Sequence, residues 1–231
     1  MMEGVRGRLV LGTTAIFFVV TAALALRPVQ QFDLALRDVA DAHRSQLAYD
    51  IAVNVNRLGS GSWLALIALL VAAALAIRRR NWWPLAPVAA AFALTGASLT
   101  VLKWFFDRPP PHSALPDAVA LFSEPGGLSY PSGHAVNAVV WYGVIFGLLS
   151  VGNRWLRIAP VALVGVVSIY LAFHWLTDVL AGICLGVIID QVVRRVGPAD
   201  RADRAPGLRP AAPQLPPRCR RPRRRRWRCR R

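Results

Sequence analysis

The sequence is short of cysteine and of acidic residues, and each shortage excludes a class of site. Its 231 residues include three cysteines, Cys184, Cys219 and Cys229, whose spacing fits neither a metal site nor a disulfide framework. Aspartate and glutamate together number 12, and no cluster of them could hold a divalent metal. We therefore expect no metal and no cofactor.

Lysine is also scarce, and the positive charge lies mostly in one segment. Lys103 is the one lysine beside 27 arginines, and the formal net charge is +16. Residues 194–231 contain 15 arginines and two aspartates, so the rest of the chain is nearly balanced. This balance argues against a nucleic-acid-binding fold. The tail, residues 197–231, is rich in proline and arginine and is predicted to be disordered. It could bind anionic lipid or have no role.

Long apolar runs are what the sequence has in abundance. Hydrophobic residues make up 55% of the chain, with a mean hydropathy of +0.41. Several runs approach the roughly 20 residues that span a bilayer. We predict one all-α domain over residues 1–196, a bundle of six transmembrane helices. Their approximate ranges are 9–26, 62–77, 83–102, 133–151, 156–173 and 179–193.

Two stretches near the N-terminus allow more than one interpretation. The first run, with arginines before it, could be a signal peptide, but it is long enough to span and lacks an Ala-x-Ala cleavage site followed by a soluble domain. Residues 27–60 alternate charged and apolar side chains. This pattern predicts an amphipathic helix at the membrane surface, with a solvated loop as the alternative.

Arginine placement predicts the orientation of the six spans. Short loops rich in arginine face the cytoplasm. The arginines that would share that side are Arg6, Arg8, Arg78, Arg79, Arg80, Arg154, Arg157, Arg194 and Arg195. Three polar stretches, 27–60, 103–133 and 174–178, then meet at the outer face. The apolar runs and this orientation predict a multi-pass protein of the cell membrane, and we expect a bacterial plasma membrane with the active site outside. The arginine-, alanine- and proline-rich composition also suggests a GC-rich genome.

The stretch Ser129-Tyr130-Pro131-Ser132-Gly133-His134 predicts the start of a helix. Proline cannot sit inside a helix, Ser132 is a favoured N-cap, and Gly133 allows close approach. A helix N-terminus offers free N–H groups and the positive end of the dipole, which together suit an anion. His134 would stand beside that anion. The alternative is a plain N-cap with a bystander histidine.

A second pair of residues, His174 and Asp178, has the spacing of neighbours on one helix face. A carboxylate there can hold one imidazole nitrogen as a donor and leave the other with a free lone pair, as a nucleophile or base needs. A capping aspartate beside an interfacial histidine is the alternative. Lys103 and Arg108 add positive charge, although Lys103 alone could be an interfacial anchor.

Three segments of the chain resemble the signature motifs of a known family. They are Lys103–Pro109, Pro131–His134 and Tyr170–Asp178. They look like the motifs of the type 2 phosphatidic acid phosphatase (PAP2) superfamily, six-span membrane enzymes that remove phosphate from lipid phosphates without a metal. The resemblance implies that His174 attacks phosphorus and forms a phosphohistidine, Asp178 orients it and His134 protonates the leaving group. It also implies that phosphate is bound by Lys103, Arg108, Ser132 and Gly133.

The sequence departs from the family pattern at two arginine positions. Pro110 stands seven residues after the lysine, and Ser168 stands six residues before the last histidine, where the family has arginine. The expected substrate is a lipid phosphate or pyrophosphate, such as phosphatidic acid, a polyprenyl pyrophosphate or a glycosylated polyprenyl phosphate. A lipid phosphotransferase with a hydroxyl acceptor, or a degenerate binder of lipid phosphate, are the alternatives. Membrane lipids are expected partners, and the oligomeric state is open.

Overall fold

The computed structural model describes residues 2–115 and 117–196, with side chains from residue 7 onward, and most of these residues are helical. They contain no β-strand, and an isolated bridge pairs Arg108 with Leu128. The tail predicted for residues 197–231 lies outside the described residues. The helices are α1 (Met2–Ala23), α2 (Arg27–Ala42), α3 (Gln46–Asn56), the 3-10 turn η1 (Arg57–Gly59), α4 (Gly61–Arg79), α5 (Leu85–Phe106), α6 (Gly133–Leu148), α7 (Arg154–Tyr170) and α8 (Leu176–Val196).

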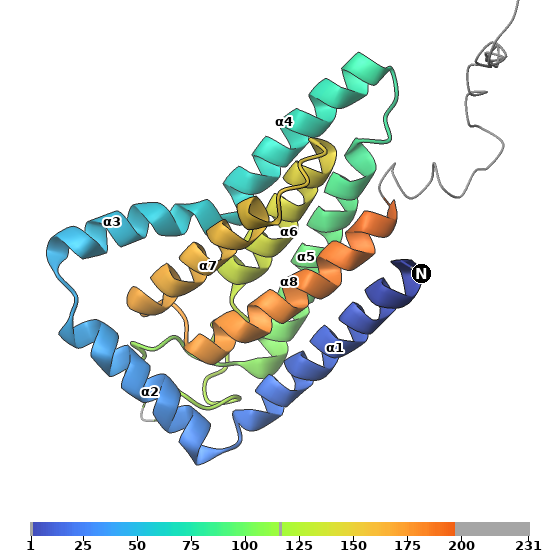
Figure 1. Cartoon of the computed structure of the whole chain (residues 1–231). Coiled ribbons are helices and arrows are strands. Elements are labelled where there is room, and N and C mark those ends of the chain that lie inside the picture. The colour runs from blue at the N-terminus through green and yellow to red at the C-terminus, as the bar shows by residue number, and fades with distance from the viewer. Residues whose placement is uncertain (1, 116, 197–231) are drawn as a thin grey trace, which may run out of the picture.

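Most of the helices run lengthwise through the molecule, and α2 and α3 lie at one end of it (Figure 1). The lengthwise helices are α1, α4, α5, α6, α7 and α8. Helix α2 turns away from α1 by 89° and continues into α3, which leads to the start of α4. The polar stretch 27–60 therefore forms two helices and a 3-10 turn, where one amphipathic helix was expected.

The number of helices that are long and apolar enough to cross a membrane is smaller than predicted. Among the described residues, α4, α5 and α8 meet that test, and α1 with α2 would make a fourth as a bent span. Helix α6 is apolar but has 16 residues. At about 1.5 Å per residue it is about 24 Å long, less than the hydrocarbon core of a typical bilayer. The all-helical class is thus confirmed, and the count of six spans stays a proposal.

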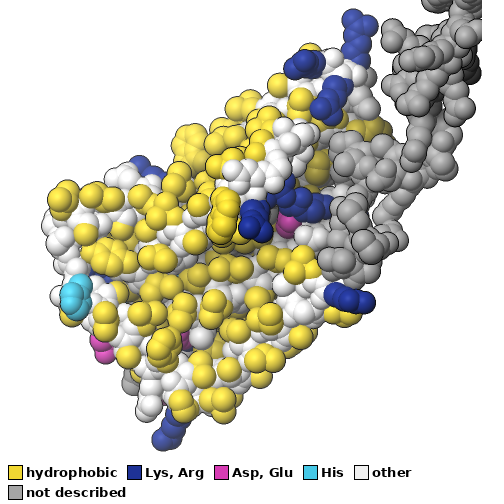
Figure 2. Space-filling model, in the orientation of Figure 1, with side chains coloured by type: hydrophobic (Ala, Val, Ile, Leu, Met, Phe, Trp, Pro, Cys, Tyr) yellow, Lys and Arg dark blue, Asp and Glu magenta, His cyan; other side chains and the backbone are white. Residues whose placement is uncertain are grey.

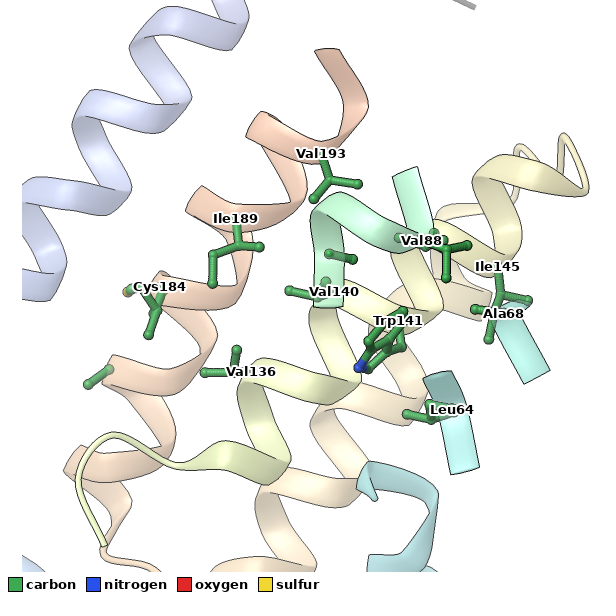
Figure 3. Packing of buried hydrophobic residues seen from close by; sticks show 14 of the residues in the cluster. Leu64, Ala68, Val88, Val136, Val140, Trp141, Ile145, Cys184, Ile189 and Val193 are labelled. Atoms are coloured by element: carbon green, nitrogen blue, oxygen red, sulfur yellow. The ribbon is translucent and has the colours of Figure 1, made fainter. Parts of the chain in front are cut away.

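Helices α6 and α8 pack tightly against each other at the centre of the molecule. Figure 3 shows Val136 and Val140 of α6 beside Ile189 of α8, and these side chains are buried. The backbones of the two helices come close at Gly182 of α8, where an added Cβ would lie 2.6 Å from the carbonyl oxygen of Ser132. Glycine at this position lets the start of α6 rest directly on α8.

The outer surface of the bundle is largely apolar. Figure 2 shows hydrophobic side chains over most of the face in view, with arginine and lysine gathered mainly toward the end where α4 closes. Ile77, Phe92 and Trp104 on α4 and α5 are 70% exposed or more. A surface of this kind is costly in water and suits the hydrocarbon core of a bilayer.

Candidate active site

The N-terminus of α6 has the local structure that the sequence predicted. Ser132 is the N-cap, and its Oγ accepts a hydrogen bond from the N–H of Ala135 at 3.3 Å. The N–H of Ser132 donates to the carbonyl of Asp178 at 3.0 Å, which fixes this turn on the first turn of α8. Gly133 and His134 follow as the first two residues of the helix, where backbone N–H groups have no acceptor within the helix. The turn thus offers an anion two backbone donors.

The two histidines predicted for catalysis lie next to each other. The ring centroids of His134 and His174 are 5.8 Å apart, and the ring planes cross at 64°. His174 stands in the break between α7 and α8 and is buried, whereas His134 is partly exposed. The 3-10 turn packs against His134, because an added Cβ at Gly59 would lie 3.3 Å from the Cβ of His134. The second and third motifs therefore meet through the packing of α6, η1 and α8.

Ser129 bridges the side chains of Asp178 and His174. The Oδ2 atom of Asp178 lies 3.7 Å from Nδ1 of His174, which is too long for a hydrogen bond. Ser129 lies between them: its hydroxyl donates to Asp178 Oδ2 at 2.5 Å, and its Oγ is 3.4 Å from His174 Nδ1. The N–H of Trp175 also donates to Asp178 Oδ2, at 3.1 Å. The carboxylate is thus held on the Nδ1 side of the imidazole.

Lys103, in the last turn of α5, lies at the anion site. Its Nζ donates a hydrogen bond to the carbonyl of Leu128. Its Cε would be 3.8 Å from a Cβ added at Gly133, so the ammonium group stands close to the N-terminus of α6.

Tyr130 anchors the loop between α5 and α6, since it is fully buried and its hydroxyl shares a 2.5 Å hydrogen bond with Thr21. Burial raises the pKa of Tyr130 to about 12, so this phenol stays neutral and is no candidate for proton transfer.

Arg108 has a different place from the one predicted. Its side chain is fully buried, and its guanidinium donates two hydrogen bonds to the carbonyl of Val119, one to Oγ1 of Thr177, one to Oδ1 of Asp178 at 2.5 Å and one to Oδ2 of Asp33 at 2.8 Å. Nε and the two amino groups supply five N–H donors, and these five bonds use them all. The sequence predicted a phosphate contact, but in this arrangement Arg108 lies behind Asp178 with no donor left for a phosphate oxygen.

The loop after α5 explains the burial of Arg108. The chain folds back so closely that a Cβ added at Gly127 would lie 2.7 Å from the backbone carbon of Arg108. The N–H of Ser129 donates to the carbonyl of Arg108 at 2.9 Å, and Asp107 Oδ1 accepts from the N–H of Gly126. His112 lies on the outside, 3.1 Å from a carboxylate oxygen of Asp41. Asp107 and His112 thus lie outside the site, although the predicted topology put their stretch, residues 103–133, at the same outer face of the membrane.

The two positions that lack the family arginine are filled in different ways. Pro110 is exposed. Ser168 is buried in α7, and its Oγ donates to Oδ1 of Asn56 at 2.8 Å. A neutral pair therefore occupies the place where the resemblance would put a guanidinium.

Sequence reasoning missed Asp33, Ser129 and Thr177 as members of the site. Ser129 begins the turn Ser129–His134, but no spacing to another polar residue marked it as part of the site. Asp33 did leave a signal, because an acidic residue lies on the apolar stripe of a helix. That stripe also includes Val29, Leu36 and Ala40.

Comparisons with known proteins identify the family of the chain. The model of the PAP2 superfamily matches residues 84–201, just over half of the chain. Phosphatidylglycerophosphatase B of Bacillus subtilis is 28% identical over 188 residues, which cover 77% of this chain and 89% of that protein. Decaprenylphosphoryl-5-phosphoribose phosphatase of Mycobacterium tuberculosis is 32% identical over 138 residues, which cover 58% of this chain and 71% of that protein.

A solved structure has the same fold. It is the crystal structure of the transmembrane PAP2 type phosphatidylglycerolphosphate phosphatase from Bacillus subtilis, with a TM-score of 0.69 and 25% sequence identity. The match covers 87% of this chain and 98% of that one. The resemblance inferred from three motifs is confirmed by the family match and by this structure. The chain belongs to the PAP2 superfamily.

Proposed function

We propose that this chain removes phosphate from a lipid phosphate or pyrophosphate through a phosphohistidine intermediate on His174, at the extracytoplasmic face of the membrane. The observation that carries the proposal is the pair of imidazoles, His134 and His174, whose centroids are 5.8 Å apart beside the N-terminus of α6. A phosphoryl group between two imidazoles has a nucleophile on one side and a proton donor on the other, as a displacement at phosphorus needs.

Phosphate oxygens would be bound by groups at the start of α6 and the end of α5. The N–H groups of Gly133 and His134 point out of the helix end, and Lys103 adds a full positive charge beside them. Ser132 accepts from Ala135 through its Oγ and keeps its own hydroxyl proton as a donor. We place Arg108 in this account as a support of Asp178, and not as a phosphate ligand.

The hydrogen bonds around His174 favour one tautomer. Ser129 donates to Asp178, so Nδ1 of His174 can donate its proton to Ser129 Oγ, and Nε2 keeps its lone pair. Nε2 attacks phosphorus and the bond from phosphorus to the lipid oxygen breaks while His134 gives that oxygen its proton. Water then attacks the phosphohistidine, His134 takes a proton from the water, and the bond from phosphorus to nitrogen breaks to release phosphate.

The proposed reaction needs no metal ion. Among residues 2–115 and 117–196, no group of three or more His, Cys, Asp or Glu side chains is arranged to hold one. Positive charge for the transition state would come from Lys103 and from backbone N–H groups. The corresponding test is activity in EDTA: we expect it to persist, and a loss that a divalent ion restores would contradict the metal-free mechanism.

The substrate class follows from the relatives and from the apolar surface. The two relatives are named as phosphatases of phosphatidylglycerophosphate and of decaprenylphosphoryl-5-phosphoribose. We propose a substrate of the same kind, a terminal phosphate on a membrane lipid. The site would face outside, because Arg78, Arg79 and Arg80 close α4 at the opposite end of the bundle, and arginine-rich short loops face the cytoplasm.

The test is phosphate release by the protein purified in detergent. The substrate panel contains phosphatidylglycerophosphate, phosphatidic acid, a polyprenyl pyrophosphate and a glycosylated polyprenyl phosphate, and His174→Gln is the control. We expect wild type to release phosphate from at least one lipid and His174→Gln from none. Transfer of the phosphoryl group to an added alcohol without release would identify a phosphotransferase. Binding without either reaction would identify a degenerate binder, and the proposal would then fail.

A further inference from the structure

A buried cluster of polar side chains connects α2 to the catalytic aspartate. It consists of Asp33 from α2, Arg108 from the loop after α5, and Thr177 and Asp178 from the first turn of α8. All four are buried, and Arg108 and Asp178 are fully so. Asp33 lies outside all three motifs and 75 residues before Arg108 in the chain. Groups of this charge are seldom buried unless they are paired, so their joint burial indicates a specific arrangement.

Asp33 makes three hydrogen bonds to this cluster. Its Oδ1 accepts from the backbone N–H of Thr177 at 3.2 Å. Its Oδ2 accepts from the Thr177 hydroxyl at 2.5 Å and from the Arg108 guanidinium at 2.8 Å. Asp33 therefore caps the N-terminus of α8 from a different helix, while it also holds one arm of Arg108.

The other arm of Arg108 holds the catalytic carboxylate. Nη1 donates to Asp178 Oδ1 at 2.5 Å and to the Thr177 hydroxyl at 2.8 Å. Arg108 is thus shared between two carboxylates, one on each amino group. Because a guanidinium can bind one carboxylate through both arms, Arg108 would turn toward Asp178 if Asp33 did not hold its second arm. Such a turn would draw Asp178 away from Ser129 and His174.

The face of Trp175 lies over this guanidinium and limits its movement. The centre of the Arg108 guanidinium is 5.2 Å from the centroid of the Trp175 ring, and the indole N–H donates to the carbonyl of Pro109 at 3.0 Å. The ring on one side and the Val119 carbonyl, which accepts two of its bonds, limit how far Arg108 can turn, and the two carboxylates determine how its amino groups are shared.

We propose that Asp33 is a positioning residue for the phosphatase reaction, acting through Arg108 to hold Asp178 against Ser129 and His174. This inference rests on the proposed function, and it adds a residue of α2 to the machinery that orients the nucleophile. Asp33 does not touch the phosphoryl group in this account. Its removal should therefore reduce the rate of phosphoenzyme formation and leave substrate binding nearly unchanged.

The first test compares two aspartates of the same helix. Asp33→Asn keeps the shape of the side chain and removes its charge, and Asp38→Asn is the matched control, since Asp38 is exposed and pairs with Arg37 on the surface. We expect Asp33→Asn to lower kcat by about tenfold to a hundredfold, as small displacements of a catalytic group do, with KM within about twofold of wild type. Asp38→Asn should behave as wild type.

The second test uses the charge balance of the cluster. Arg108→Gln leaves Asp33 and Asp178 buried without their shared cation, so it should lower both kcat and the thermal unfolding temperature. In that background Asp33→Asn removes one of two unpaired carboxylates, and we expect it to raise the unfolding temperature and to recover part of kcat. The same substitution is therefore harmful alone and helpful in the Arg108→Gln variant.

Four outcomes decide the matter. Harm from Asp33→Asn alone and benefit in the Arg108→Gln background would support the proposal. An active wild type with an Asp33→Asn variant of unchanged kcat would overturn it and leave the proposed function standing. Asp33→Asn protein that unfolds but keeps full activity per folded molecule would make Asp33 a structural residue and overturn it too. A wild type that releases no phosphate would remove the proposed function and this inference with it, while the unfolding temperatures would still report whether the charges are coupled.

Discussion

His134 and His174 differ in burial and in partners, and this difference supports the roles that we propose for them. His174 is buried beside Ser129 and Asp178, whereas His134 is partly exposed on the first turn of α6. A nucleophile needs a fixed orientation, and a proton donor needs access to the leaving oxygen and to water. The more buried imidazole, which has the carboxylate behind it, is therefore the one that we propose as the nucleophile.

The two roles predict different responses to the leaving group. His174→Ala should abolish turnover of every substrate. His134→Ala should slow a lipid alkoxide, a poor leaving group, far more than a nitrophenyl phosphate, which needs little protonation; a general acid typically contributes about 10²- to 10⁴-fold. The measurement is kcat for both substrates in both variants. Equal losses on the two substrates would remove the general-acid role from His134.

The position of Arg108 in the fold could not be predicted from its motif. The motif identified Arg108 as a cation near the site. It did not predict that the loop folds back over this side chain, because that fold depends on Gly127 and on contacts with α2 and α8. The same sequence predicted the N-cap and the pair His174 and Asp178, because these follow from local spacing. The predicted topology and the family resemblance placed His134 beside them. The long-range partner Asp33 required tertiary contacts.

Arg108→Lys tests the revised position of this side chain. Lysine has three donors on a single nitrogen and cannot reproduce bonds to two carboxylates and a carbonyl. We expect kcat to fall by about tenfold or more, with little change in inhibition by vanadate. Lys103→Gln is the comparison, and it should weaken vanadate inhibition because Lys103 stands at the anion site. If Arg108→Lys weakens vanadate inhibition as strongly, Arg108 contacts phosphate as the sequence predicted.

At the scale of elements, the contact of α6 with α8 positions the whole site. The start of α6 carries His134 and the anion site, and the start of α8 carries Asp178. Hydrophobic runs predicted the helices at these places to within a few residues at most ends. Helix α8 begins at Leu176, three residues before its predicted start, because Asp33 and Asp178 both accept N–H groups at its first turn. The predicted ranges ignored such caps.

Substitution of Gly182 should disturb that contact. In Gly182→Ala the new methyl group would lie 2.6 Å from the Ser132 carbonyl oxygen, which is backbone and cannot move aside easily. We expect a loss of about 1–3 kcal/mol in stability, typical of overpacking, together with reduced kcat. Gly96→Ala in α5 is the control, since nothing lies within 4 Å of its added Cβ, and it should be neutral or slightly stabilising. Thermal unfolding of both variants in detergent would check this, and equal stability of the two would contradict the close contact.

At the scale of the whole molecule, the apolar surface and the PAP2 fold describe a multi-pass membrane protein. Composition alone predicted this class, because the length and hydropathy of the runs depend little on tertiary structure. The number of crossings was harder to predict. Helix α6 is short, α1 and α2 meet at 89°, and only packing against neighbours decides whether such helices span.

The orientation predicts which loops are accessible from outside. In a background where Cys219 and Cys229 are replaced by serine, Ala114→Cys at the site end should react with an impermeant thiol reagent in intact cells. Gly152→Cys, in the turn between α6 and α7, should react only after the cells are opened, because that turn lies at the opposite end. Both residues are exposed, so burial does not account for a lack of labelling. The reverse pattern would place the site in the cytoplasm.

The most direct test of the central claim is to trap the phosphoenzyme. Wild-type protein is mixed with a lipid phosphate labelled in its terminal phosphate, quenched within milliseconds and digested, and the labelled peptide is sequenced. We predict a label on His174 that is stable to alkali and lost in acid, as expected of a phosphorus–nitrogen bond, and no label in His174→Ala. A label on a serine, or rapid turnover with no covalent label at any time of quenching, would contradict the mechanism.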